Sequence, residues 1–254
     1  FIDGLSGMAQ GLFATLIIGT IIQQIGTLVG GSTGDMIYAV GKVAAALTGA
    51  GIGVGVAAKF KESYLVVVSA ATAGMVGAFA SKLLAGTVLV DGTMVFAGPG
   101  EPLGAFLAAY VGIECGHLVA GKTKVDILVT PIVTIGTGSL VGLLVGPGVS
   151  KIMTSLGAMI NWGVEQQPFL MGIVVSVLMG MILTLPISSA ALGIILNLSG
   201  LAAGAATVGC CCNMVGFAVA SYRENKIGGL VAQGIGTSML QVPNIVRKPL
   251  IWLP

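Results

Sequence analysis

A long stretch without charge constrains this chain more than any other feature. The 57 residues from Gln166 to Tyr222 contain no Asp, Glu, Lys or Arg, and residues 4–34, 63–81 and 127–150 are equally free of charge. A helix needs about 20 mainly apolar residues to cross a hydrocarbon core roughly 30 Å thick. Four such stretches in 254 residues leave too little polar surface to cover a soluble globule. The chain is therefore predicted to be a polytopic membrane protein.

The composition points the same way and excludes one class of partner. Hydrophobic residues make up 56% of the chain and charged residues 8%, whereas a soluble domain carries about 25% charged residues. The net charge of +2 is too small to indicate a nucleic-acid partner, so none is predicted. The basic residues form short clusters between the apolar stretches, as in loops retained on the cytoplasmic side of a membrane. These clusters are residues 59–61, 122–124, 223–226 and 247–248.

Glycine is unusually frequent, with 41 residues, many of them inside the apolar stretches. Small residues let helix backbones approach closely in lipid, where apolar contact alone gives a helix no preference for another helix over lipid tails. Glycine-rich helices also bend and break. Closely packed and partly broken helices are therefore predicted.

The apolar stretches predict an all-α membrane protein with about seven or eight transmembrane helices in one domain, residues 1–254. The expected spans are residues 8–30, 36–58, 63–84, 102–120, 125–147, 168–190, 195–220 and 227–246. The chain begins at Phe1 without Met and stops after the apolar residues 250–253, so it is expected to be a fragment of a longer protein.

The basic clusters predict that one apolar segment is re-entrant. With residues 59–61 and 122–124 on the cytoplasmic side, three full spans after residue 124 would place residues 223–226 outside, against the positive-inside rule. The best candidate surrounds Pro186, because proline removes a helix hydrogen bond and Ser188 and Ser189 can satisfy freed backbone groups. Broken helices at membrane depth form many transporter binding sites. The alternative is that the basic clusters are a weak topology signal.

Four sequence segments resemble one known family. They are residues 124–135 (KVDILVTPIVTI), 183–191 (LTLPISSAA), 212–226 (CNMVGFAVASYRENK) and 233–239 (QGIGTSM). They are similar to the EIIC-like membrane components of the phosphotransferase system, in the branch that includes the perfringolysin-O regulatory-type proteins. The similarity covers most of the chain from about residue 10 onward.

The resemblance implies a fold, a mechanism and partners. It implies an all-α fold with re-entrant hairpins, a homodimer, and an elevator-like shift that moves a sugar across the bacterial cytoplasmic membrane. It also implies separate IIA and IIB proteins, so that this chain is at most the translocating component of a sugar phosphotransferase. Family members extend beyond residue 254, which agrees with the expected fragment.

Ionisable residues inside apolar stretches are the first candidates for a solute path, because burying one in lipid costs at least about 2.5–3.5 kcal/mol. Glu114 and His117 are three residues apart and so share a helix face. A carboxylate accepts hydrogen bonds from sugar hydroxyls, and a neutral imidazole donates or accepts them. The alternative is a helix end where Glu114 simply pairs with a lysine.

Other polar residues are further substrate-binding candidates. Glu101, before Pro102, resembles the Glu-Pro element with which sugar-translocating subunits grip a hydroxyl, and Asn161 and Glu165 lie in a similar context. Asn213 and Gln233 are neutral and cheaper to bury, so they are candidates either for ligand contact or for hydrogen bonds between helices. A solvated loop position is the alternative for each glutamate.

No cofactor and no metal site are expected. The chain has one histidine, and the three adjacent cysteines at residues 210–212 point about 100° apart on a helix and cannot converge on one ion. Three functions are weighed: a permease for a small polar solute, expected to be a sugar; a membrane regulator or sensor with the same fold; and a scaffold for a complex. The predicted broken helix and the intramembrane Glu and His favour the first two.

Overall fold

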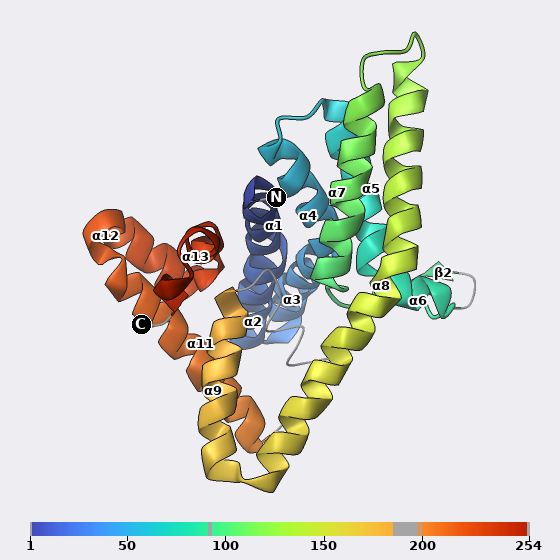
Figure 1. The fold of residues 1–254 in the computed structure, drawn as a ribbon. Coiled ribbons are helices and arrows are strands. Elements are labelled where there is room, and N and C mark those ends of the chain that lie inside the picture. The colour runs from blue at the N-terminus through green and yellow to red at the C-terminus, as the bar shows by residue number, and fades with distance from the viewer. Residues whose placement is uncertain (1, 91–92, 185–197, 199, 253–254) are drawn as a thin grey trace. The chain divides into compact units, whose positions relative to one another are not determined.

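The computed structural model describes residues 2–90, 93–184, 198 and 200–252 (Figure 1). The predicted hinge residues Pro186, Ser188 and Ser189 lie outside this part of the chain. The chain divides into two compact units, Asp3–Ser150 and Lys151–Pro254. Nearly all regular structure in both is helical, because the charge-free stretches can satisfy their backbone groups in lipid only within helices or closed barrels.

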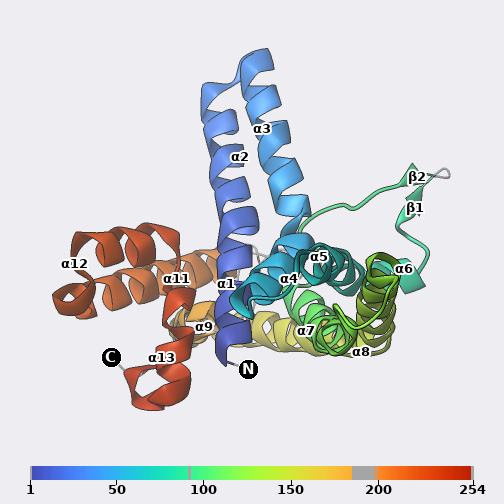
Figure 2. The same cartoon turned by 90° about the horizontal axis from the view of Figure 1, so that it is seen from above.

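The first unit begins with a helical hairpin (Figure 2). Helix α1 (Ile2–Leu12), a π-helical turn η1 (Phe13–Ile17) and α2 (Ile18–Val29) run on continuously, and α3 (Gly31–Ala46) returns beside α2. Gly30 has φ 65° in the turn, a conformation that favours glycine. A Cβ on Gly26 would lie 2.7 Å from the Gly34 carbonyl oxygen, so only glycine permits this backbone contact.

The expected span over residues 36–58 is bent rather than straight. Helix α3 and α4 (Thr48–Lys59) meet at Leu47 with an angle of 53°. The buried hydroxyl of Thr48 donates to the Ala45 carbonyl oxygen at 2.6 Å, and this bond satisfies a backbone group beside the break. A broken helix thus occurs in the first unit, where no proline marks it.

The core of the first unit consists of α1, α4, α5 (Tyr64–Ala78), α6 (Ala80–Leu84), α7 (Pro102–Val119) and the first part of α8 (Asp126–Gln166). Small residues set the spacing: a Cβ on Gly112 of α7 would lie 2.6 Å from the Thr134 carbonyl oxygen of α8. Phe79 and Phe106 are the largest fully buried side chains. The loop before α7 carries a short antiparallel hairpin that was not expected, β1 (Leu89–Val90) with β2 (Thr93–Met94).

Helix α8 is longer than predicted. The expected span ended at residue 147 and a connection was expected up to residue 167, yet the helix runs through Pro131 and Pro147 for 41 residues. The helix passes Lys151 and ends at Gln166, two residues before Pro168. At 1.5 Å per residue the helix is roughly 60 Å long.

In the second unit, α9 (Pro168–Thr184) packs against α11 (Gly200–Ala220). The contact is again between backbones, since a Cβ on Gly180 would lie 2.8 Å from the Gly209 carbonyl oxygen. At the end of the chain, the Trp252 indole donates to the Thr184 hydroxyl at 2.7 Å and ties the last described turn to α9.

The predicted span over residues 227–246 is wrong. The segment divides into α12 (Tyr222–Val231), a π-helical turn η2 (Ala232–Gly236), a 3-10 turn η3 (Ser238–Gln241), α13 (Val242–Arg247) and a 3-10 turn η4 (Pro249–Trp252). Four glycines between residues 228 and 236, together with Pro243, weaken a continuous helix. Lys226 is also non-helical, with φ 53°.

Among the described residues, four helices are long and apolar enough to cross a membrane: residues 3–29, 102–119, 126–152 and 200–220. The bent pair α3 and α4 would make a fifth span, and α5 and α9 are shorter apolar helices. The prediction of an all-α polytopic membrane protein is confirmed.

Candidate functional site

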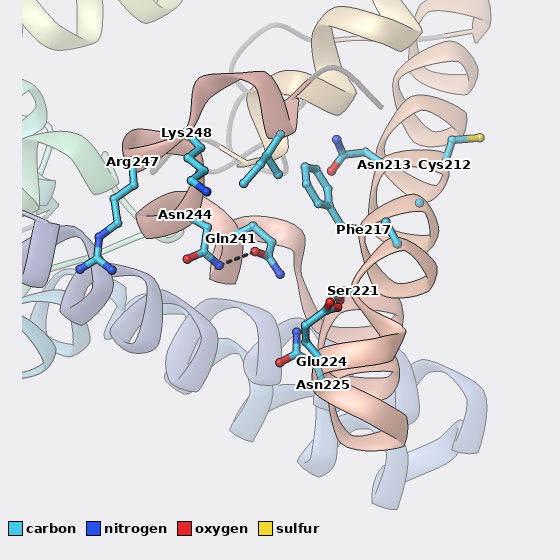
Figure 3. Close-up of a pocket in the computed structure, with 13 residues that line it drawn as sticks. Cys212, Asn213, Phe217, Ser221, Glu224, Asn225, Gln241, Asn244, Arg247 and Lys248 are labelled. Atoms are coloured by element: carbon cyan, nitrogen blue, oxygen red, sulfur yellow. Dashed lines mark hydrogen bonds between the residues drawn. The ribbon is translucent and has the colours of Figure 1, made fainter.

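A pocket in the second unit is the candidate site (Figure 3). Its volume of about 700 Å³ lies within the range of about 300–1,000 Å³ typical of small-molecule sites. One wall follows a single face of α11 and α12, with residues 212, 213, 216, 217, 220, 221, 224 and 225. The other wall comes from η3, α13 and the turn beyond, with residues 241, 244, 247, 248 and 251. The break of the segment into short helices is what folds the second wall back onto the first.

A chain of hydrogen-bonded amides organises the pocket. Asn244 Nδ2 donates to Gln241 Oε1 at 2.8 Å, and Gln241 Nε2 donates to Gln233 Oε1 at 2.9 Å. Gln233 Nε2 in turn donates to the Ser221 hydroxyl at 3.0 Å. Gln233 and Gln241 are buried, and a fully satisfied buried network fixes one arrangement of the elements that carry it. These three hydrogen bonds join the start of α12 to η2, η3 and α13.

A second polar contact holds α11 to η3. The Ser238 hydroxyl donates to Asn213 Oδ1 at 2.6 Å, and Asn213 also lines the pocket. Phe217, one turn further along α11, is buried and presents an apolar surface to the same pocket. The wall formed by α11 therefore offers an amide and an aromatic ring side by side, while Asn225 and Asn244 add further amides (Figure 3).

The rim of the pocket carries charges of both signs. Glu224 comes from α12, while Arg247 and Lys248 come from the end of α13, and all three side chains are exposed. None of the three forms an ion pair with another residue in the described part of the chain. In Figure 3 the Lys248 side chain extends in the direction of Asn244, whereas the Arg247 side chain extends away from Asn244.

Two of the seven predicted substrate-binding residues belong to this pocket. Asn213 lines it and accepts a hydrogen bond from Ser238, while Gln233 belongs to the hydrogen-bonded amides behind it. Hydrogen bonding between helical segments is therefore observed for Asn213, and ligand contact stays a prediction. Asn161 and Glu165 lie near the end of α8, where the structure describes the helix but not these side chains.

The other three predicted residues belong to the first unit. Glu101 caps α7: its carboxylate accepts from the Leu103 N–H at 3.4 Å. Burial raises the pKa of the Glu101 carboxyl, and the hydrogen bond from Leu103 opposes that rise. Protonation of Glu101 is thus easier than in water, which is compatible with a hydroxyl-binding or proton-carrying group as well as with a structural cap.

Glu114 and His117, the two candidates predicted to share a face of α7, have different surroundings. His117 Nδ1 lies 3.0 Å from Glu62 Oε1 and 3.1 Å from Glu62 Oε2. Glu62 belongs to the loop between α4 and α5, so this pair joins the loop containing residues 59–61 to the end of α7, next to residues 122–124. Both basic clusters therefore lie at one end of the first unit. Glu114 is exposed on α7.

The pocket residues missed by the sequence analysis are Glu224, Asn225, Gln241, Asn244, Arg247 and Lys248. The spacing of residues 241, 244 and 248 does place them on one helix face, which was a usable signal. The expectation of a continuous span over residues 227–246 hid it. Among the described residues, no group of three His, Cys, Asp or Glu side chains is placed to hold a metal ion.

These features define an all-α integral membrane protein with a solute-sized pocket that carries several amide and charged side chains. The chain belongs to the phosphotransferase-system EIIC family, because the family model described as "Phosphotransferase system, EIIC" matches residues 2–254. Comparisons with curated proteins and with solved structures gave no match. The family assignment confirms the predicted resemblance and makes the chain a phosphotransferase-type membrane permease that works with other components of that system.

Proposed function

We propose that the protein translocates a sugar, and that the pocket between α11, α12 and α13 binds it. The observation that carries this proposal is the ordered set of amides on a cavity of about 700 Å³. An amide offers both donors and an acceptor, as paired sugar hydroxyls require. The buried ring of Phe217 adds an apolar surface for the carbon–hydrogen face of a sugar ring.

The amides retain unused hydrogen-bonding capacity. Asn244 uses one N–H on Gln241, which leaves a second N–H and its carbonyl oxygen for a ligand. Asn225 and the Glu224 carboxylate supply further acceptors on the facing wall. Because the buried amides behind them are fixed by their own bonds, little side-chain freedom is lost when a ligand binds.

The test is binding of a panel of radiolabelled hexoses and disaccharides to purified protein in lipid discs. At least one sugar should bind, and Asn244→Ala should weaken that binding about fivefold, the loss expected for one neutral hydrogen bond of about 1 kcal/mol. Gln24→Ala, which removes an exposed amide on α2, is the matched control and should bind as wild type does. Equal affinity of the two variants would remove the pocket from the proposal.

A second measurement concerns coupling to phosphorylation. Vesicles containing the protein should bind or slowly equilibrate the sugar. Phosphoenolpyruvate with the general phosphotransferase enzymes and a cognate IIB protein should convert the uptake to sugar phosphate. Binding without phosphorylation by any IIB protein would favour the sensor interpretation instead.

A further inference from the structure

We propose that the solute bound in this pocket carries an anionic group, and that Lys248, assisted by Arg247, binds that group. The inference rests on the proposed function and adds the charge class of the substrate. A sugar carrying a carboxylate is the ligand class that this pocket would take.

The position of Lys248 is the first support. Residues 241, 244 and 248 recur at helical spacing on one face, and all three line the pocket. Lys248, Asn244 and Gln241 line the same pocket, and Figure 3 shows that the Lys248 side chain extends in the direction of Asn244. A ligand that reaches these amides therefore places one end close to a positive charge.

The charge balance is the second support. Residues 151–254 contain five Lys and Arg residues and two Glu residues. In the described part of the chain neither Lys248 nor Arg247 has a carboxylate within ion-pairing distance, although Glu224 lines the same pocket. An anion in the pocket would be attracted by Lys248 and, at longer range, by the neighbouring charge of Arg247.

The distribution of polar groups is the third support. The cations lie at the end of α13, whereas Glu224 and Asn225 lie on the opposite wall, on α12. A ligand with an acidic group at one end and hydroxyls at the other complements both walls. Its acidic group would face the cations, and its hydroxyls would donate to the Glu224 carboxylate, which repels a second acid. A neutral sugar would leave both cations without a ligand partner.

The alternative is that residues 247–248 are basic only because they flank the membrane on the cytoplasmic side. That alternative predicts no dependence of ligand affinity on the charge of Lys248. The two interpretations therefore differ in a single measurable quantity, the affinity for an acidic sugar relative to its neutral parent.

The experiment measures affinities for glucose, galactose and mannose and for the corresponding uronates, in discs of phosphatidylcholine. At least one acidic sugar should bind about tenfold or more tightly than its neutral parent at low ionic strength, as expected for a charge-assisted hydrogen bond. Lys248→Gln should remove that preference, so that the acidic sugar and its neutral parent bind with similar affinity. Arg223→Gln removes a cation of the same unit that does not line the pocket, and it should retain the preference.

The outcomes are separable. Equal affinity for acidic and neutral sugars, or an unchanged preference in Lys248→Gln, overturns the charge assignment and leaves the proposed function standing. No binding by any member of the panel overturns both. If phosphatidylglycerol in the disc abolishes binding of the acidic sugar, the cations form a lipid headgroup site and the substrate assignment is wrong.

Discussion

The contact between α9 and α11 makes a quantitative prediction about a single methyl group. A Cβ added at Gly209 would overlap the Ser176 carbonyl oxygen and lie 2.5 Å from the carbonyl carbon and 2.8 Å from the Ser176 Cα. These are backbone atoms, so no side chain can turn away. The two helices must separate by about 1 Å or more, and overpacking of this kind costs about 1–3 kcal/mol and occasionally more.

The Gly209→Ala variant should therefore melt at a lower temperature than wild type. Alanine returns up to about 1 kcal/mol of helix propensity, which leaves a net loss of roughly 1–2 kcal/mol. For a chain of this length 1 kcal/mol corresponds to about 2–4 °C, so the apparent Tm should fall by roughly 2–8 °C. The measurement is thermal unfolding of the purified protein in detergent, followed by exposure of the native cysteines to a thiol-reactive dye.

Gly204→Ala is the matched control on the same helix. No described atom outside its own helix turn lies within 4 Å of a Cβ at this position, so the variant gains propensity without a clash. Its apparent Tm should equal or exceed that of wild type. If Gly209→Ala melts within 1 °C of wild type, α9 and α11 do not pack backbone to backbone, and the placement of the α11 wall of the pocket would have to be revised.

Four further substitutions test the first unit. Thr134→Val should leave the stability unchanged or raise it, because the buried Thr134 hydroxyl has no hydrogen-bond partner among the described residues. Thr130→Val should instead cost about 1–2 kcal/mol of stability, because it removes the 2.6 Å hydrogen bond from the Thr130 hydroxyl to Asp126. Burial raises the pKa of Glu101 in the folded protein above its ordinary value of 4.5. The stability should therefore fall as the pH rises from about 4.5 through the raised pKa, and Glu101→Gln should flatten that part of the plot of Tm against pH. Lys61→Gly should raise the apparent Tm slightly, because φ 58° strains any residue with a Cβ. A lowered Tm for Thr134→Val, an unchanged pH profile for Glu101→Gln or a destabilised Lys61→Gly would each contradict its argument.

Much of the fold follows from the charge-free stretches alone. The helices over residues 2–29, 102–119 and 200–220 lie close to their expected positions, because about 20 apolar residues between polar turns leave the backbone no alternative in lipid. The bend at Leu47 was not predictable at that position, because the glycines that surround it are spread along the whole of residues 41–55. The length of α8 was missed because Lys151 and Pro147 look like a boundary, yet neither ends the helix.

The candidate site was only partly predictable for a different reason. Asn213 and Gln233 stand out as polar residues within apolar sequence, and both take part in the pocket. Asn244 and Lys248 do not stand out, since near a predicted span end they read as ordinary boundary residues. Their role arises from tertiary folding: η2 and η3 turn the chain back so that α13 faces α11 and α12. No local pattern specifies that return.

The hairpin of α2 and α3 has a mechanical consequence. Its two helices touch through glycine backbones rather than through side chains that can repack, so residues 18–46 behave as one stiff body. At the base of the hairpin, one leg passes through the π-helical turn η1 and the other through the break at Leu47. Thr15 of η1 lies against Gly51, just past that break, so the two irregularities lie at the same level. The hairpin is thus a rigid element connected to the rest of the first unit through two adjacent helix irregularities. Any bending of the first unit would concentrate at these two positions, where both helices depart from regular α-helical geometry.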